Sequence, residues 1–136
     1  MNSKHQIIKH FAEDWGDHSP QYEICLSIVD YLERTNLERL RFMSFKHLKG
    51  EVAPNSGDAE FWRSALYLTG ASFKILDFGY QMIDELGQAY TLEIEDVRQA
   101  KITGELIHPY TGEPVEDYQN HVFIYFFPGT NAQGLV

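Results

Sequence analysis

The clearest pattern in the chain is an alternation of apolar and polar residues on both sides of a turn, over residues 73–94. Apolar side chains at every second position lie on one face of a β-strand. The two stretches with this spacing are Leu76, Phe78, Tyr80 and Met82, and then Tyr90, Leu92 and Ile94. Between them, Gly87 stands where a type I turn with a bulge needs a left-handed backbone. We therefore predict an antiparallel hairpin, whose apolar face other parts of the chain must cover because two strands are not stable alone.

The first half of the chain spaces its apolar residues as amphipathic helices do. Ser3 and Gln6 form a capping-box pattern that begins a first helix, and the pair Ser19-Pro20 begins a second. The pattern predicts a third helix over residues 36–49, with a break near Ser44 as the alternative, and a fourth helix over residues 58–69. These helices are the candidates to cover the apolar face of the hairpin.

Two further elements are expected after the hairpin. Glu95 and Asp96 begin a short helical stretch that Gly104 ends. Residues 122–127 are apolar at every position, which favours a strand that is covered on both faces.

Together these elements predict an α+β fold, in which about four N-terminal helices pack on a small, mostly antiparallel sheet built from the central hairpin and a C-terminal strand. The chain has 136 residues, which is the size of one domain. We expect a single globular domain over residues 1–129 and a flexible C-terminal tail over residues 130–136. Phe11, Phe78 and Leu92 are expected in its core.

Composition bears on the compartment of the protein and on membrane association. A single cysteine, Cys25, allows no internal disulfide bond and favours the cytoplasm. No apolar run approaches the roughly 18 residues that a membrane-spanning helix needs, so we expect no membrane association.

Charge is distributed unevenly. The net charge of −9 opposes non-specific binding to nucleic acid or anionic lipid. Residues 34–49 nevertheless carry five basic side chains against one acid, whereas residues 77–117 carry ten acids against two basic side chains. The candidate binding residues are therefore Arg34, Arg39, Arg41, Lys46 and Lys49.

No stretch of the chain has the pattern of a catalytic, metal-binding or cofactor-binding site. The six histidines lack the spacing of metal ligands on one helix face, and the glycines are too scattered to form a phosphate-binding loop. Cys25 lies on the apolar stripe of the second helix, which is typical of an inert core thiol. We predict no catalytic residue, no metal site and no cofactor.

The function that these observations favour is a non-catalytic protein-interaction module that binds itself as a homodimer or binds another protein. A second subunit would cover one face of the apolar C-terminal strand. The interface residues predicted on that strand are Phe123, Tyr125 and Phe127.

Two other classes stay open. The order of helices followed by a hairpin resembles a winged helix, which implies a nucleic-acid-associated protein that would use the basic segment 34–49. This reading is disfavoured because the helix before the hairpin carries one basic residue, Arg63, and the hairpin turn carries Asp84 and Glu85. The high aromatic content, 14%, leaves room for a small-molecule binder or enzyme with an aromatic-lined pocket.

Overall fold

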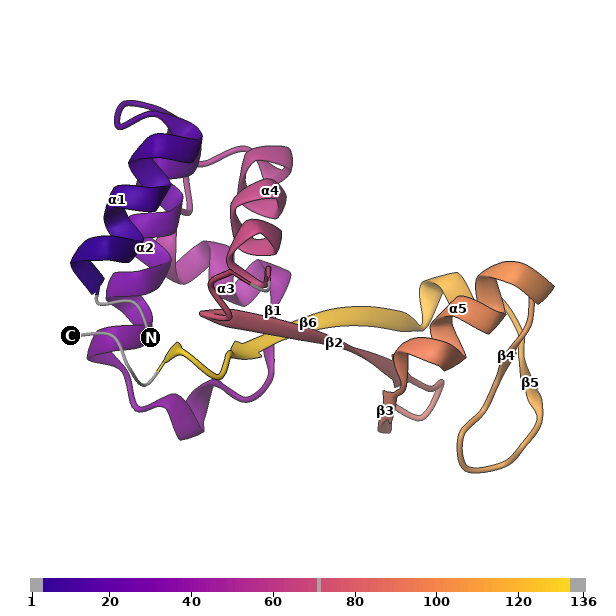
Figure 1. Ribbon diagram of the computed structural model, residues 1–136. Coiled ribbons are helices and arrows are strands. Elements are labelled where there is room, and N and C mark those ends of the chain that lie inside the picture. Colours follow the sequence, from indigo (N-terminus) through magenta and orange to yellow (C-terminus); the bar gives the residue numbers. More distant parts are fainter. Residues whose placement is uncertain (1–3, 71, 133–136) are drawn as a thin grey trace. The chain divides into compact units, whose positions relative to one another are not determined.

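The computed structural model describes residues 4–70 and 72–132. Its fold is α+β, as the hydrophobic pattern predicted, with five α-helices, a small antiparallel sheet of four strands and a further pair of strands within these residues (Figure 1). The α-helices are α1 (Lys4–Trp15), α2 (Pro20–Arg34), α3 (Phe45–Val52), α4 (Asp58–Leu68) and α5 (Ile94–Thr103), and two 3₁₀-helices are η1 (Leu37–Leu40) and η2 (Tyr118–Asn120). The strands are β1 (Met43–Ser44), β2 (Leu76–Ile83), β3 (Ala89–Leu92), β4 (Leu106–Ile107), β5 (Pro114–Val115) and β6 (Val122–Pro128).

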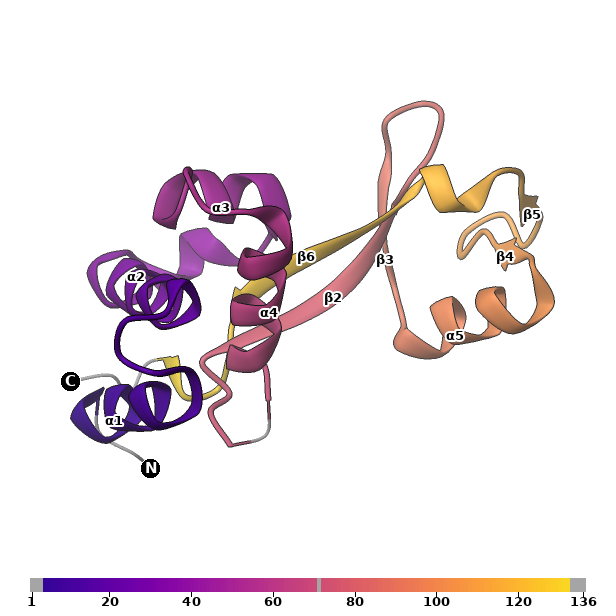
Figure 2. The same ribbon diagram turned by 90° about the horizontal axis from the view of Figure 1, so that it is seen from above.

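The predicted hairpin is confirmed as β2 and β3. The two strands pair antiparallel, with Tyr80 opposite Leu92 and Met82 opposite Tyr90. Gly87 has the positive φ that the turn requires, +80°. The hairpin forms one side of a sheet with strand order β1-β6-β2-β3, so the apolar strand β6 is an inner strand (Figure 2). A separate pair, β4 with β5, makes a second small sheet.

The chain packs into two compact units. The first unit consists of residues 1–77 and 126–136, and the second consists of residues 78–125. Strands β2 and β6 contribute residues to both units. The single domain expected over residues 1–129 stays a prediction.

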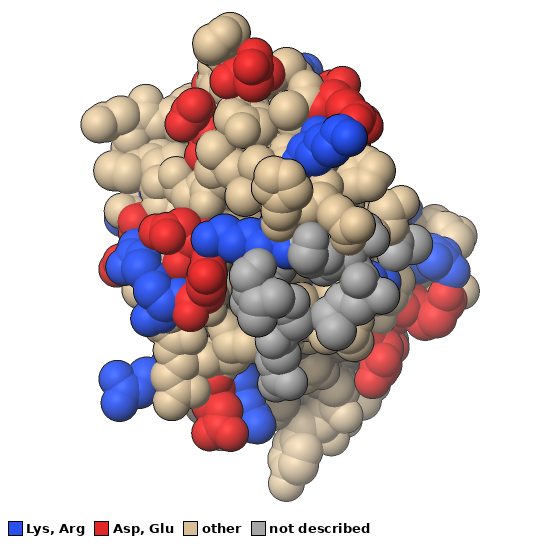
Figure 3. All heavy atoms as spheres, turned by 60° about the vertical axis from the view of Figure 1, so that its left-hand side comes forward, with Lys and Arg blue, Asp and Glu red and all other residues tan. Residues whose placement is uncertain are grey.

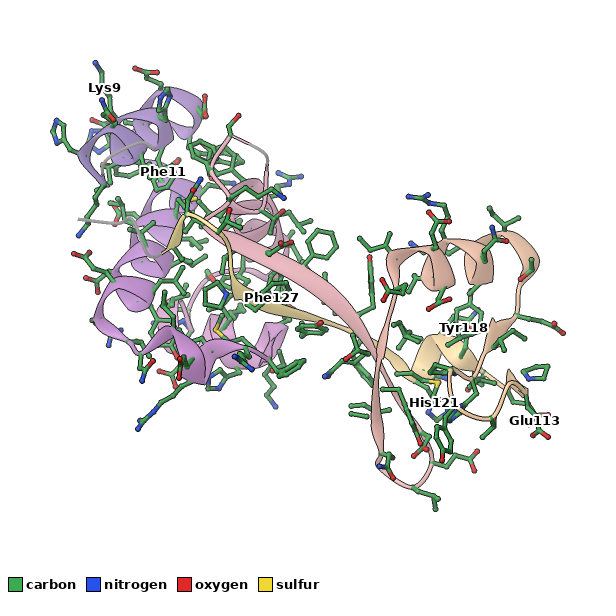
Figure 4. All side chains as sticks on the ribbon, turned by 60° about the horizontal axis from the view of Figure 1, so that its bottom comes forward. Lys9, Phe11, Glu113, Tyr118, His121 and Phe127 are labelled. Carbon is green, nitrogen blue, oxygen red and sulfur yellow. The ribbon has the colours of Figure 1, made fainter. Side chains whose placement is uncertain are left out.

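The first unit is built around the helices α1 to α4. Helix α2 packs against α1, α3 and α4, and Phe11 of α1 is fully buried among them (Figure 4). Its ring meets those of Tyr67 and Phe73 at 5.9 and 5.6 Å between centroids. Ser19 begins α2 as predicted, because its hydroxyl oxygen accepts a hydrogen bond from the backbone N–H of Tyr22 at 3.1 Å.

One continuous helix over residues 36–49 is wrong, whereas the alternative of a break near Ser44 is confirmed. That stretch forms η1, the short strand β1 and then α3. Ser44 is extended (φ −66°, ψ 160°), and its hydroxyl oxygen accepts from the backbone N–H of His47 at 3.0 Å, so a new helix begins there. Because β1 pairs with β6, the tertiary sheet interrupts the local helical pattern.

The second unit has a small core of its own. Its buried members come from the hairpin, from α5 and from β4: Met82, Leu92, Val97, Ala100 and Leu106. Helix α5 begins with a capping box between Glu93 and Asp96, slightly before the predicted start at Glu95. It ends at Gly104 in the left-handed conformation, as the sequence predicted. Of the expected core residues, Leu92 is buried, whereas Phe78 is only half-buried and packs edge-on against Tyr80.

The end of β6 is tied to the segment before β2. The backbone N–H of Gly129 donates to the carbonyl of Ile75 at 2.8 Å, and Asn131 donates from its backbone and its side chain to the carbonyls of Lys74 and Phe73. Residues 133–136 of the expected flexible tail lie outside the described residues. No helix in the described ranges is long and apolar enough to cross a membrane.

We predict that Gly129→Ala destabilises the protein, because an added Cβ would lie 2.2 Å from the carbonyl oxygen of Lys74, a backbone atom that cannot swing aside. The expected loss in the free energy of unfolding is about 1–3 kcal/mol, the range for overpacking. Urea denaturation followed by the fluorescence of Trp15 and Trp62 measures it, since both side chains belong to the first unit.

Gly50→Ala is the matched control. Gly50 lies in α3 with nothing within 4 Å of an added Cβ, so this change should raise stability by about 0.5–1 kcal/mol. An unchanged denaturation midpoint for Gly129→Ala would contradict the packing described at the end of β6.

Candidate functional site

The second unit contains a cleft of about 350 Å³. Three segments line it: the turn between β2 and β3, the connection from β4 through β5, and His121 just before β6. The lining residues are Met82, Asp84, Glu85, Leu86, His108, Thr111, Glu113, Pro114, Val115, Glu116 and His121. Figure 4 shows Glu113 and His121 on these two different segments of the second unit.

Asp84 is held in place by the turn that it begins. One carboxylate oxygen, Oδ1, accepts hydrogen bonds from the backbone N–H groups of Leu86 at 3.0 Å and Gln88 at 2.9 Å. The other oxygen, Oδ2, faces Nε2 of His108 at 3.9 Å. That separation exceeds a direct hydrogen bond. The carboxylate of Asp84 also takes part in a hydrogen bond with the side chain of Tyr90. Its two oxygens together offer about four lone-pair sites, so the group keeps capacity to accept from a ligand.

The tautomer of His108 follows from its hydrogen bonds. Its Nδ1 accepts from the backbone N–H groups of Tyr110 at 3.0 Å and Thr111 at 3.2 Å. A ring nitrogen that accepts carries no proton, so the neutral ring bears its proton on Nε2. The side chain is only 12% exposed. His108 therefore presents a fixed N–H donor beside the carboxylate of Asp84.

His121 has the opposite arrangement. Its Nδ1 lies 3.0 Å from the backbone carbonyl oxygen of Ile83, which can only accept, so Nδ1 carries the proton. In the neutral ring Nε2 is then an acceptor. The backbone N–H of Ile83 in turn donates to the carbonyl of His121 at 2.8 Å, which fixes the position of the residue.

The electrostatics of the cleft favour a cation. Four of its lining residues are acidic and none is Lys or Arg: the acidic ones are Asp84, Glu85, Glu113 and Glu116. The second unit as a whole has nine acidic and two basic residues, a net charge of −7. The floor is apolar, because Met82 is fully buried and Val115 is half-buried. This combination suits a positively charged group on an aliphatic stem.

Aromatic rings flank the cleft behind His108. The ring of Tyr90 meets the His108 ring edge-on at 4.6 Å and stacks on Tyr110 at 6.4 Å between centroids. Burial raises the pKa of the Tyr90 hydroxyl above its usual value, and the neighbouring negative charge of Asp84 raises that pKa further. Tyr90 therefore stays neutral beside the Asp84 carboxylate.

The basic residues predicted to bind a partner lie in the first unit, and the structure brings only some of them together. Lys46 and Lys49 line a hollow of about 430 Å³ with Phe45, Gly50, Pro54 and Asp58. The ammonium of Lys49 lies 3.6 Å from the carboxylate of Asp58, which reduces the net positive charge there.

The arginines of segment 34–49 differ in their surroundings. Arg34 is paired with Asp30, with 3.2 Å between Nε and Oδ2. Arg39 and Arg41 are exposed at the end of η1. On the face of the molecule in Figure 3, Lys and Arg side chains are interspersed with Asp and Glu side chains.

The predicted interface residues on β6 are unequal in exposure. Phe123 is 49% exposed, whereas Tyr125 and Phe127 are half-buried. Tyr125 lies against Gly79 of β2, where an added Cβ would come within 2.6 Å of its hydroxyl oxygen. Phe123 is therefore the member of this set that offers most surface to a partner.

The described residues bear on two kinds of reactive group, a metal site and a cysteine nucleophile. They contain no group of three or more His, Cys, Asp or Glu side chains arranged to hold a metal ion. Cys25 is fully buried, and this burial raises the pKa of its thiol to about 12, so the thiolate that would attack a substrate is not formed near neutral pH.

Comparisons with protein-family models, curated proteins and solved structures find no match for this chain. The cleft residues Asp84, His108 and His121 were not predicted as a site from the sequence. Asp84 was expected only as a turn residue, and the two histidines are isolated along the chain. The one sequence signal for this cleft was the excess of acidic residues in the segment that contains them.

The shifted pKa of Tyr90 gives a test of the cleft geometry. Asp84→Asn removes the charge but keeps an oxygen that accepts from the turn, so the pKa of Tyr90 should fall toward the usual tyrosine value of about 10. NMR titration of ¹³C-labelled tyrosine, assigned with Tyr90→Phe, measures this change.

Glu105→Gln removes a charge from the same unit and should leave the Tyr90 titration unchanged. The raised pKa also means that the folded state loses stability as the pH rises above the usual tyrosine value, because the unfolded chain releases this proton first. If Tyr90 titrated identically in wild type and Asp84→Asn, the proximity of the two groups in solution would be refuted.

Proposed function

We propose that the protein is a non-catalytic protein-interaction module that pairs with a second copy of itself. One observation carries the proposal: exposed apolar side chains and negative charge are concentrated in the same small unit. Among the described residues, eight large apolar side chains are exposed, and six of them belong to the second unit. These six are Leu86, Ile94, Ile102, Ile107, Tyr110 and Phe123.

Exposed apolar surface of this kind is unfavourable in an isolated chain. Single exposed apolar residues are ordinary, but several in one unit of 48 residues favour contact with another protein. Leu86 and Tyr110 are 92% and 83% exposed, although both are large. Their burial in an interface would contribute roughly 25 cal/mol per Å² of apolar surface.

Charge supports a second copy as the partner. The second unit carries a net charge of −7, whereas residues 34–49 of the first unit carry +4. Two copies therefore contain complementary surfaces, and complementary charge sets the orientation and speed of association more than its affinity. Soluble oligomers are most often two-fold symmetric dimers, in which each surface is used twice.

Sedimentation equilibrium at micromolar concentration tests the proposal. We expect a species of twice the 15.8 kDa monomer mass, which dissociates progressively as the salt concentration rises because exposed charges are screened. A single 15.8 kDa species at all salt concentrations would exclude self-association under these conditions. Phe123→Ser should weaken the dimer if the exposed residue of β6 belongs to the interface.

Nucleic acid is disfavoured as the partner. Of the five basic residues in segment 34–49, Arg34 and Lys49 lie beside acidic side chains, and the whole chain is acidic. We therefore expect no binding to duplex DNA with a dissociation constant near about 10⁻⁸ M, the range typical of sequence-specific complexes at physiological salt. Fluorescence anisotropy with a labelled duplex measures this; tight binding that Arg39→Glu with Arg41→Glu abolishes would reverse the conclusion.

A further inference from the structure

We propose that the cleft of the second unit receives an arginine side chain from the Arg39–Arg41 segment of a second copy of this chain. This inference rests on the proposed self-association and names the segment and the cleft that would meet. It identifies the ligand by its chemistry, a guanidinium group on an aliphatic stem.

The cleft offers acceptors and apolar surface to an arginine side chain. The guanidinium group has five N–H donors and no acceptor. The cleft offers acceptors to it: Oδ2 of Asp84, the carboxylates of Glu85 and Glu113, and Nε2 of His121. The apolar floor at Met82 and the exposed side chain of Leu86 suit the aliphatic stem.

Two of these acceptors, Asp84 and His121, are fixed in position before any ligand arrives. Backbone N–H groups hold Asp84 and His108, and the backbone of Ile83 holds His121. A site whose side chains are already ordered loses little conformational entropy on binding. The cleft also contains no Lys or Arg among its lining residues, so no cation of its own occupies the acceptors.

The Arg39–Arg41 segment is the best donor of such a side chain. Both arginines are exposed, and the segment forms the end of a short 3₁₀-helix followed by two residues before β1. Arg34 is already paired with Asp30, and Lys49 lies beside Asp58. Phe42, which is 58% exposed, adds apolar surface next to the arginines that matches the apolar rim at Leu86 and Tyr110.

Reciprocal charge reversal tests the inference. The segment variant carries Arg39→Glu with Arg41→Glu. The cleft variant carries Glu85→Lys with Glu113→Lys. Each double variant alone should raise the dimer dissociation constant at least about tenfold, because like charges then face each other. An equimolar mixture of the two variants should restore association to within about threefold of wild type, through the reversed pairs.

Two controls separate local from general effects. Lys9→Glu with Arg63→Glu makes the same change in net charge as Arg39→Glu with Arg41→Glu, but on exposed residues of the first unit outside the Arg39–Arg41 segment. This control should alter the dimer dissociation constant less than about threefold. Thermal unfolding of every variant checks that it folds. Asp84 is left unchanged in these variants because its carboxylate also holds the turn.

The outcomes distinguish the inference from the proposed function. A dimer that resists both charge reversals, but dissociates with Phe123→Ser, would overturn the arginine inference and leave self-association standing. A chain that stays monomeric throughout would overturn both. Restoration by the mixed variants, with unchanged behaviour of the control, would support the contact of Arg39 or Arg41 with the cleft.

Discussion

The pairing of β2 with β6 is the constraint on which the rest of the structure depends. These strands are far apart in the sequence, and the chain between them forms the rest of the second unit. At one end the N–H of Gly129 donates to the carbonyl of Ile75, and at the other the N–H of Ile83 donates to the carbonyl of His121, both at 2.8 Å. Two glycines permit this pairing. A Cβ at Gly79 would collide with Tyr125 of β6, and a Cβ at Gly129 would collide with the backbone of Lys74, just before β2. Closing so long a loop costs only slightly more entropy than closing a short one.

The second unit shows what a small core can and cannot cover. Its 48 residues bury five side chains between the hairpin, α5 and β4. Units of this size bury a smaller fraction of their surface than larger domains do, so large apolar side chains remain exposed. The hydroxyl of Tyr118 donates to the carbonyl of Ala100 at 3.1 Å, which joins η2 to α5 and supports the core. The same packing places the β2–β3 turn beside the connection between β4 and β5, and the cleft lies between these segments.

The negative charge of the second unit bears on both its stability and its proposed binding. A net charge of −7 on a small unit is self-repulsive, which opposes compaction. A positively charged partner would relieve that repulsion while it covered the exposed apolar side chains. The backbone fixes the orientation of Asp84, His108 and His121, so the cleft combines defined acceptors with a defined donor.

The sequence by itself determined the local elements of this protein. Alternation of apolar residues predicted the β2–β3 hairpin, Gly87 its turn, Ser19 the start of α2, and Glu95, Asp96 and Gly104 the limits of α5 within two residues. Each of these signals acts over a few residues, through backbone dihedral angles and caps, and so it can be read without knowing the rest of the fold.

Only the tertiary structure decided which segments meet. Segment 36–49 contributes β1, which pairs with the distant strand β6. Strands β2 and β6 are each shared between the two units. The cleft joins Asp84, His108 and His121, which no spacing in the sequence connects. The physical reason is that apolar periodicity reports which face of an element must be covered, but it does not specify which distant segment covers it.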